Sequence, residues 1–138
     1  MRALIFAAGR GERMRPLSDR TAKPLLRAGG RLLIEYQIEA LVRAGIRELV
    51  INLAHLADSF APLLGDGSAY GARIVYSREG DAAEDALETL GGIVKARPLL
   101  GDAPFVAVSG DVVTDFDYRR LAAHAQAIAL GAADAHLV

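Results

Sequence analysis

Two glycines and several arginines follow a short apolar run near the N-terminus, and their types and spacing suit phosphate binding. Gly9 and Gly11 allow the backbone to approach a ligand closely and to turn its amide groups toward phosphate oxygens. The planar guanidinium of an arginine binds two phosphate oxygens at once. The arginines of this segment are Arg10, Arg13 and Arg15. We therefore interpret the segment as a loop that holds a phosphate chain.

The residues that follow exclude two well-known phosphate loops. A Walker A loop ends in Gly-Lys-Ser or Gly-Lys-Thr, which this segment lacks. The dinucleotide-binding fingerprint needs a third glycine where this chain has Met14. It also needs an acid after the second strand, where this chain has none. A glycine pair alone is a weak signal, because glycines after a strand often serve as turn residues.

The basic residues are concentrated at the start of a chain that is nearly neutral overall. The formal net charge is −1, which argues against a general affinity for nucleic acid or for an anionic membrane. Residues 1–31 carry a net charge of +6 and the remainder a net charge of −7. From charge alone, a local anion site and a solvated basic rim explain this equally well. Fourteen of the sixteen basic residues are arginines, so a lysine at position 23 favours a role for a compact ammonium there.

A carboxylate follows the apolar run of residues 105–108. Asp111 lies just past this expected strand, and a hard oxygen ligand there would suit Mg²⁺ bound to phosphate oxygens. The alternative is that Asp111 forms a turn or caps a helix. The expected place of Asp111 beside the glycine loop favours metal binding over this alternative. Asp115 and Asp117 are better explained as caps. The three histidines have no metal-ligand spacing, and we interpret His55 as a structural residue.

The elements that must position these residues alternate between strands and helices. This alternation predicts a doubly wound, Rossmann-like and mostly parallel sheet with helices on both faces. Ligands of such sheets bind at the carboxyl ends of the strands. The expected strands are residues 3–7, 48–52, 72–77 and 105–108, and the expected helices are residues 34–42, 56–64, 87–96 and 117–130.

Three proline and terminal features refine this expectation. Pro62 predicts that the helix over residues 56–64 is short or restarts there, and Pro98 is expected to end the helix before it. Residues 135–138 are expected to start a fifth strand. We therefore expect the 138 residues to be a single nucleotide-binding part that lacks a C-terminal sugar-binding part.

Composition places the chain among globular proteins of one domain. It has 138 residues, 52% of them apolar and none of them cysteine. The longest apolar run at the N-terminus, residues 3–8, is too short for a membrane span or a signal-peptide core. We therefore expect a cytoplasmic protein. The sequence carries no signal of oligomeric state.

The loop is part of a longer pattern that resembles a known family. The pattern is Ala7-Ala8-Gly9-x-Gly11-x-Arg13-Met14-x-Pro16-Leu17, followed by Lys23-Pro24-Leu25. It is similar to the signature of the sugar-phosphate nucleotidyltransferases. Within them, the Ala-Leu-Glu-Thr segment at residues 86–89 resembles the N-acetylmuramate-1-phosphate uridylyltransferase branch. The resemblance runs over the whole chain and covers about three-fifths of such an enzyme.

The resemblance implies a reaction and a set of roles. A sugar-1-phosphate, here N-acetylmuramate 1-phosphate, would be joined to an NTP, with UTP favoured, and pyrophosphate would leave. The implied catalytic residues are Arg13 and Lys23, and Asp111 would bind Mg²⁺. The implied nucleotide-binding residues are Ala8, Gly9, Gly11, Glu12, Arg13, Met14, Lys23, Asn52, Thr89 and Gly91.

Departures from the family pattern leave alternatives open. Leu90 stands where a small residue is expected, and Ala22 replaces the proline before the motif lysine. A mannose-1-phosphate guanylyltransferase or a glucose-1-phosphate thymidylyltransferase type of enzyme is therefore the alternative. Because a second metal-binding aspartate and most of the sugar pocket of the family lie beyond residue 138, a catalytically silent nucleotide-binding or interaction module is the alternative of another class.

Overall fold

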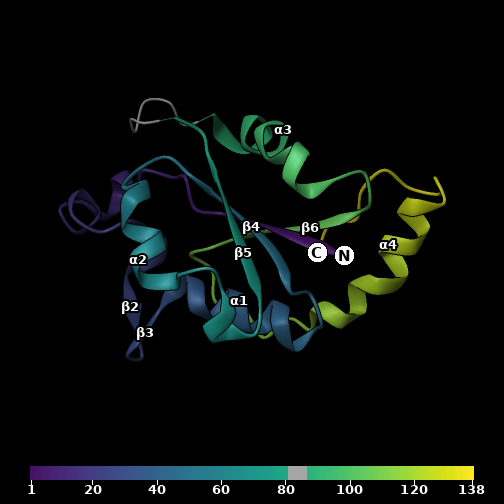
Figure 1. Cartoon of the computed structure of the whole chain (residues 1–138), viewed down its shortest axis with the longest axis horizontal. Helices are drawn as coiled ribbons and strands as arrows, with labels where there is room; N and C mark the ends of the chain where they lie inside the picture. The colour runs from purple at the N-terminus through teal and green to yellow at the C-terminus, as the bar shows by residue number, and fades with distance from the viewer. Residues whose placement is uncertain (81–86) are drawn as a thin grey trace.

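A parallel sheet forms the centre of the molecule (Figure 1). The computed structural model describes residues 1–80 and 87–138. The sheet has the order β5-β4-β1-β6, and each neighbouring pair is parallel. The strands are β1 (Arg2–Phe6), β4 (Glu48–Leu53), β5 (Arg73–Arg78) and β6 (Phe105–Ser109). The predicted doubly wound parallel sheet is confirmed.

Helices cover both faces of this sheet, as the apolar strands require. α1 (Leu33–Arg43) and α2 (Phe60–Leu64) pack on one face, and α3 (Glu88–Leu100) packs on the other (Figure 1). Ile5 belongs to the cluster with α1 and α2, whereas Leu4 belongs to the cluster with α3. Successive side chains of a strand point to opposite faces, so β1 needs apolar residues at consecutive positions.

The connection from β1 to α1 carries the residues of the glycine loop. It contains three single turns, Glu12–Met14, Leu17–Asp19 and Lys23–Leu25, and then the hairpin of β2 (Arg27–Ala28) and β3 (Arg31–Leu32). α1 begins after Leu32, whose amide donates a hydrogen bond to the Glu35 carboxylate at 2.7 Å. After β6 the chain passes through the turn Tyr118–Arg120 into α4 (Leu121–Ala129), and Asp117 caps that turn as predicted.

The two prolines behave differently from each other. α2 is preceded by the turn Ala57–Ser59 and has Pro62 at its third position. Amides of the first turn have no partner within the helix, so a short helix tolerates proline there, as predicted. The expectation that Pro98 ends the next helix is wrong, because α3 continues to Leu100. Leu100 is buried against β1 and β4, and this packing outweighs the hydrogen bond lost at the proline.

The strand expected at residues 135–138 is also absent. These residues form no regular structure in the described part of the chain, and Leu137 and Val138 are almost fully exposed. A strand needs a neighbour for its backbone hydrogen bonds, and none pairs with this segment. Among the described residues, the helices are too short or too polar to cross a lipid bilayer.

A buried glutamine ties α1 to the segment that follows β6. Gln37 is 2% exposed, and its amide nitrogen donates a hydrogen bond to the Val112 carbonyl at 2.5 Å. Its amide oxygen accepts a hydrogen bond from the Tyr118 hydroxyl at 2.7 Å. Since Val112 follows Asp111 directly, Gln37 fixes the backbone just beyond the carboxylate.

We predict that Gln37→Ala lowers the free energy of unfolding by about 1–3 kcal/mol, because it leaves the buried Tyr118 hydroxyl and the partly buried Val112 carbonyl without these partners. Urea denaturation followed by circular dichroism measures this change. Gln126→Ala, on the exposed side of α4, is the matched control and should change stability by less than about 0.5 kcal/mol. Equal effects of both variants would contradict the positioning role of Gln37.

Candidate active site

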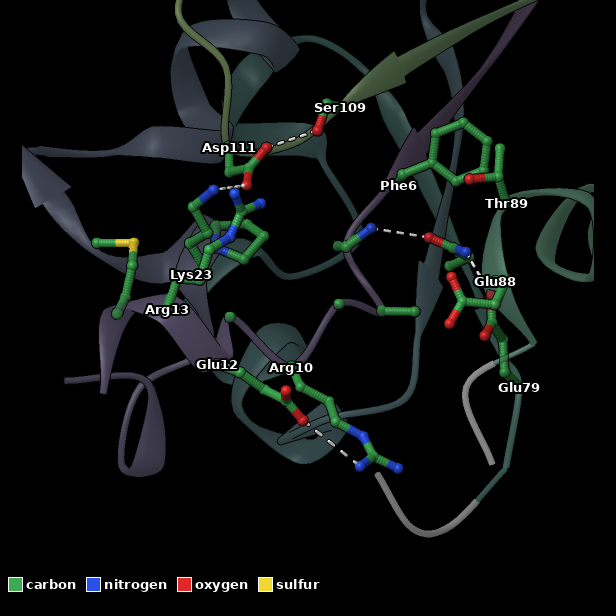
Figure 2. Close-up of a pocket in the computed structure, with 17 residues that line it drawn as sticks. Phe6, Arg10, Glu12, Arg13, Lys23, Glu79, Glu88, Thr89, Ser109 and Asp111 are labelled. Atoms are coloured by element: carbon green, nitrogen blue, oxygen red, sulfur yellow. Dashed lines mark hydrogen bonds and ion pairs between the residues drawn. The ribbon is translucent and has the colours of Figure 1, made fainter. Parts of the chain in front are cut away.

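A pocket of about 810 Å³ opens at the carboxyl ends of the four parallel strands. Its lining comes from the carboxyl ends of β1, β4 and β6, from residues that follow β1, β5 and β6, and from the start of α3 (Figure 2). The predicted site residues on its wall are Ala8, Gly9, Gly11, Glu12, Arg13, Met14, Lys23, Asn52, Thr89 and Asp111. Residues far apart in sequence, such as Arg13 and Asp111 at a separation of 98 positions, are thus brought to one cavity.

The two loop glycines have different physical reasons to be glycine. Gly11 has a φ of +63°, and a Cβ built there would lie 3.2 Å from the Ser18 Cβ. It is therefore needed for the fold of the loop. A Cβ built on Gly9 meets no atom within 4 Å. Since Gly9 lines the pocket, the absence of its side chain leaves room for a ligand.

Hydrogen bonds hold the loop in this shape before any ligand is bound. The Gly11 carbonyl accepts hydrogen bonds from the Met14 amide and from the Ser18 hydroxyl, both at 2.8 Å. The His55 ring lies 2.8 Å from the Ser18 carbonyl, which agrees with the structural role predicted for this histidine. A loop that is fixed in advance loses little conformational entropy when a ligand binds.

Asp111 reaches the loop because β6 ends beside β1. The Gly110 amide donates a hydrogen bond to the Phe6 carbonyl at 2.9 Å, and a Cβ at Gly110 would lie 3.0 Å from that oxygen. The Asp111 carboxylate then forms an ion pair with Lys23 and accepts a hydrogen bond from the Ser109 hydroxyl at 2.5 Å (Figure 2). Burial raises the pKa of Asp111, but these two partners outweigh it and hold the pKa below its ordinary value. The carboxylate is therefore ionised at neutral pH.

The opposite side of the pocket carries acidic side chains. Asn52 and Glu79 are 2% and 7% exposed, and the Asn52 amide nitrogen donates a hydrogen bond to Glu79 at 2.5 Å. The Asn52 oxygen accepts from the Ala7 amide at 2.8 Å, and Glu79 also accepts from the Leu87 amide at 2.7 Å. Both ends of the Asn52 side chain are thus used inside the protein. Asn52 joins the start of the glycine loop to the acidic side, where Glu88 also lines the wall (Figure 2).

Two residues from the sequence analysis lie away from the wall. Gly91 does not line the pocket; it lies in α3, where a Cβ would come 2.5 Å from the Leu87 Cβ. Ala86, the first residue of the Ala-Leu-Glu-Thr segment, lies outside the described residues. Arg15 forms an ion pair with Asp19 at 3.2 Å and does not line the pocket either. The basic side of the cavity is therefore formed by Arg10, Arg13 and Lys23.

Sequence reasoning missed Glu79, Glu88 and Ser109. Glu79 follows β5 directly, so an acid after the third strand, at the carboxyl edge of the sheet, was the available signal. Ser109 is the last residue of β6, two positions before Asp111. Glu88 is the glutamate of the Ala-Leu-Glu-Thr segment, and its place directly before the predicted Thr89 was the available signal.

The Asp111 carboxylate suits a Mg²⁺ ion whose other ligands are water and phosphate oxygens. Within residues 1–80 and 87–138, no three histidine, cysteine or acidic side chains come together as a metal-binding group. Mg²⁺ is commonly held by one or two carboxylates together with substrate phosphates and water. An ionised carboxylate that opens into a pocket of this size fits this arrangement, with water supplying the remaining ligands and phosphate oxygens replacing some of the water when a nucleotide binds.

Comparison with known proteins agrees with this geometry. The sequence profile named "Nucleotidyl transferase" matches residues 2–136. The chain belongs to this family. It is 54% identical over 118 residues to the N-acetylmuramate alpha-1-phosphate uridylyltransferase of Neisseria meningitidis, a match that covers 86% of the chain and 50% of that protein.

Other proteins to which the chain is similar are named for other nucleotides. The mannose-1-phosphate guanyltransferase of Aspergillus fumigatus is 34% identical over 125 residues, which cover 88% of the chain and 33% of that protein. A solved Bacillus anthracis structure, assigned as a glucose-1-phosphate thymidylyltransferase, has a TM-score of 0.79 at 24% identity and shares the fold. The match covers 90% of the chain and 49% of that structure. The chain thus spans between a third and a half of the length of these relatives.

We predict that Gly11→Ala lowers the free energy of unfolding by roughly 1–2 kcal/mol, because an L-residue is strained at a positive φ. Gly9→Ala should leave stability unchanged or raise it slightly, since the space is open and the unfolded chain loses freedom. Thermal and urea denaturation of the two variants measure the difference. Equal destabilisation would show that Gly9 also supports the loop and is not reserved for a ligand.

Proposed function

We propose that the chain is the nucleotide-binding part of an enzyme that joins a sugar-1-phosphate to an NTP and releases pyrophosphate. The observation that carries this proposal is the convergence of Gly9, Lys23 and Asp111 on one pocket. A loop with room for phosphate, a cation and a metal-binding carboxylate are the three parts that nucleotidyl transfer requires. Membership of the family supports the same reaction class.

UTP is the proposed nucleotide, and N-acetylmuramate 1-phosphate is the proposed sugar substrate. The 54% identity to an N-acetylmuramate alpha-1-phosphate uridylyltransferase supports both. A guanosine nucleotide is the second candidate, because the relative from Aspergillus fumigatus is named a guanyltransferase. A role in recycling of cell-wall sugars and a cytoplasmic location are further proposals, which rest on the resemblance and on the composition.

In the proposed mechanism the protein positions reactants and neutralises charge. A phosphate oxygen of the sugar-1-phosphate attacks the α-phosphorus of the NTP in line, and the bond to pyrophosphate breaks. The attacking phosphate is already ionised, so the step needs neither a general base nor a covalent enzyme intermediate. Arg13 and Lys23 would balance the charge that grows on the α-phosphate and on the leaving group. Mg²⁺ bound at Asp111 would supply further neutralisation of the phosphates.

The arrangement of the pocket would also orient the nucleotide. The triphosphate would lie along the basic side, with Gly9 leaving space for close approach of a phosphate. The base and ribose would then face Thr89 and the acidic side around Glu79. Holding both ends fixes the α-phosphorus relative to the attacking oxygen, which is the positioning component of the rate enhancement.

We predict that UTP with Mg²⁺ raises the melting temperature of the chain more than GTP, dTTP or ATP does. A ligand that binds the folded state alone stabilises it by about 2.7 kcal/mol at a hundredfold excess over Kd. Gly9→Val should abolish the shift without lowering the melting temperature of the ligand-free protein, because its side chain fills the phosphate space. Leu63→Val, at an exposed position on α2, is the control.

The results of this panel separate the alternatives. A larger rise in melting temperature with GTP or dTTP than with UTP would identify that nucleotide as the substrate in place of UTP. The proposed reaction class would be unchanged. No shift with any NTP would contradict the nucleotide-binding function. Binding of UTP without pyrophosphate release in the presence of N-acetylmuramate 1-phosphate would favour the catalytically silent module for this chain.

We further predict that Asp111→Asn weakens UTP binding in Mg²⁺ by a larger factor than in EDTA, because it removes charge and keeps shape. Isothermal titration calorimetry under both conditions measures the two factors. Asp115→Asn is the control, because Asp115 does not line the pocket, and it should leave both affinities unchanged. If Asp111→Asn reduced both affinities equally, Asp111 would position the loop and would not be a metal ligand.

A further inference from the structure

We propose that Lys23 acts as the internal counter-ion of Asp111 and that a divalent cation displaces it from the carboxylate. Displacement releases the ammonium toward the phosphate-binding side of the pocket. This inference rests on the proposed function, since it describes how the same site is assembled. It adds an order of events: metal binding at Asp111 makes Lys23 available to the nucleotide.

The ion pair joins two parts of the chain that meet at the pocket. Lys23 begins the turn Lys23–Leu25, and Asp111 follows β6 (Figure 2). The side chains are 36% and 19% exposed, so the pair is partly shielded from water. One carboxylate oxygen contacts the ammonium, and the other accepts the hydrogen bond from Ser109. Both oxygens of the proposed metal ligand are therefore already occupied within the protein.

A metal ion and the ammonium would compete for this carboxylate. Mg²⁺ binds carboxylate oxygens at about 2.0–2.1 Å, and it would approach the oxygen that Lys23 contacts, because Ser109 holds the other. Two cations at that oxygen would repel each other strongly in a partly dehydrated pocket. The hydroxyl of Ser109 is neutral and is compatible with the metal. Lys23 is therefore the group that must leave.

The backbone at Lys23 is fixed, so the change falls on its side chain. The neighbouring residues Ala22, Pro24 and Leu25 are buried. The flexible four-carbon stem of a lysine allows the ammonium to move while its Cα remains in place. The base of the side chain lies against the loop, since a Cβ built on Gly11 would be 3.4 Å from the Lys23 Cβ. A displaced ammonium thus stays within the pocket.

Arg13 provides a useful contrast in the same pocket. It lines the wall, but its side chain makes no ion pair or hydrogen bond with another residue in the described part of the chain. Arg13 is thus available to phosphate from the start, whereas Lys23 is held by Asp111. The two cations proposed to act on the phosphates differ in whether a metal is needed to release them.

The first experiment measures binding of Mn²⁺ alone to the nucleotide-free chain, by electron paramagnetic resonance of the free ion. Lys23→Met, which removes the charge and keeps the length, should bind Mn²⁺ at least about tenfold more tightly than the wild type. Lys95→Met is the same substitution on the exposed side of α3 and should leave the affinity unchanged. Arg13→Met should have a much smaller effect than Lys23→Met. Asp111→Asn should abolish the binding.

The second experiment uses the fact that the chain has two lysines, Lys23 and Lys95. Incorporation of lysine labelled with ¹³C at Cε yields two assignable signals in the wild-type protein. Titration with Mg²⁺ in the absence of nucleotide should shift the Lys23 signal and leave the Lys95 signal in place. In Asp111→Asn, the chemical shift of Lys23 without Mg²⁺ should lie near the value that the wild type reaches with Mg²⁺. Addition of Mg²⁺ to this variant should not change it.

The outcomes distinguish this proposal from the proposed function. Equal or weaker Mn²⁺ binding by a folded Lys23→Met variant, or equal gains in Lys23→Met and Arg13→Met, would overturn the exchange. A Lys23 signal that stays in place while Mg²⁺ binds would also overturn it. UTP-induced stabilisation of the wild type is measured separately, so the exchange can fail while the nucleotide-binding function stands. Failure of UTP binding with a positive Mn²⁺ result would instead contradict the function.

Discussion

The parallel pairing of β6 with β1 is the constraint on which the rest of the site depends. The register places Ser109 opposite Phe6, and Phe6 in turn opposite Asn52 of β4. These residues lie at the ends of β1 and β6 and one residue before the end of β4, at one level, so the segments that leave the three strands enclose a common space. Gly110 allows the chain to leave β6 within hydrogen-bonding distance of β1. Without that close approach, Asp111 would not meet the glycine loop.

The pocket is electrostatically polarised across the sheet edge. Arg13 and Lys23 come from the connection after β1, whereas Glu79 follows β5 on the far side of β4. The two ends of the proposed nucleotide need opposite surroundings. A triphosphate is stabilised by cations, whereas the N–H groups of a nucleobase donate hydrogen bonds to acceptors such as carboxylates. A strand order that puts β1 and β5 on either side of β4 therefore separates the two chemistries. Glu12 and Asp111 are anions on the basic side, and their charges are balanced by Arg10 and Lys23.

Buried polar side chains give this arrangement its rigidity. Gln37 fixes the segment after Asp111 from the side of α1, and Asn52 fixes the start of the glycine loop from β4. Each uses both ends of its amide, so each is fully satisfied in the core. In the interior an unpaired polar group is costly, and such residues therefore specify one arrangement of the segments they join. The positions of the charged side chains of the pocket follow from these ties as much as from apolar packing.

Local patterns in the sequence determined the strands, the helices on both sheet faces and the place of the loop around Gly9 and Gly11 after the first strand. They did so because apolar periodicity and glycine spacing are short-range properties of the chain. Tertiary structure decided the rest. Packing of Leu100 carries α3 past Pro98, and the lack of a pairing strand leaves residues 135–138 irregular. The burial of Glu79 beside Asn52 and the pairing of Lys23 with Asp111 join residues far apart in sequence. Such contacts depend on strand order and register, which no local pattern encodes.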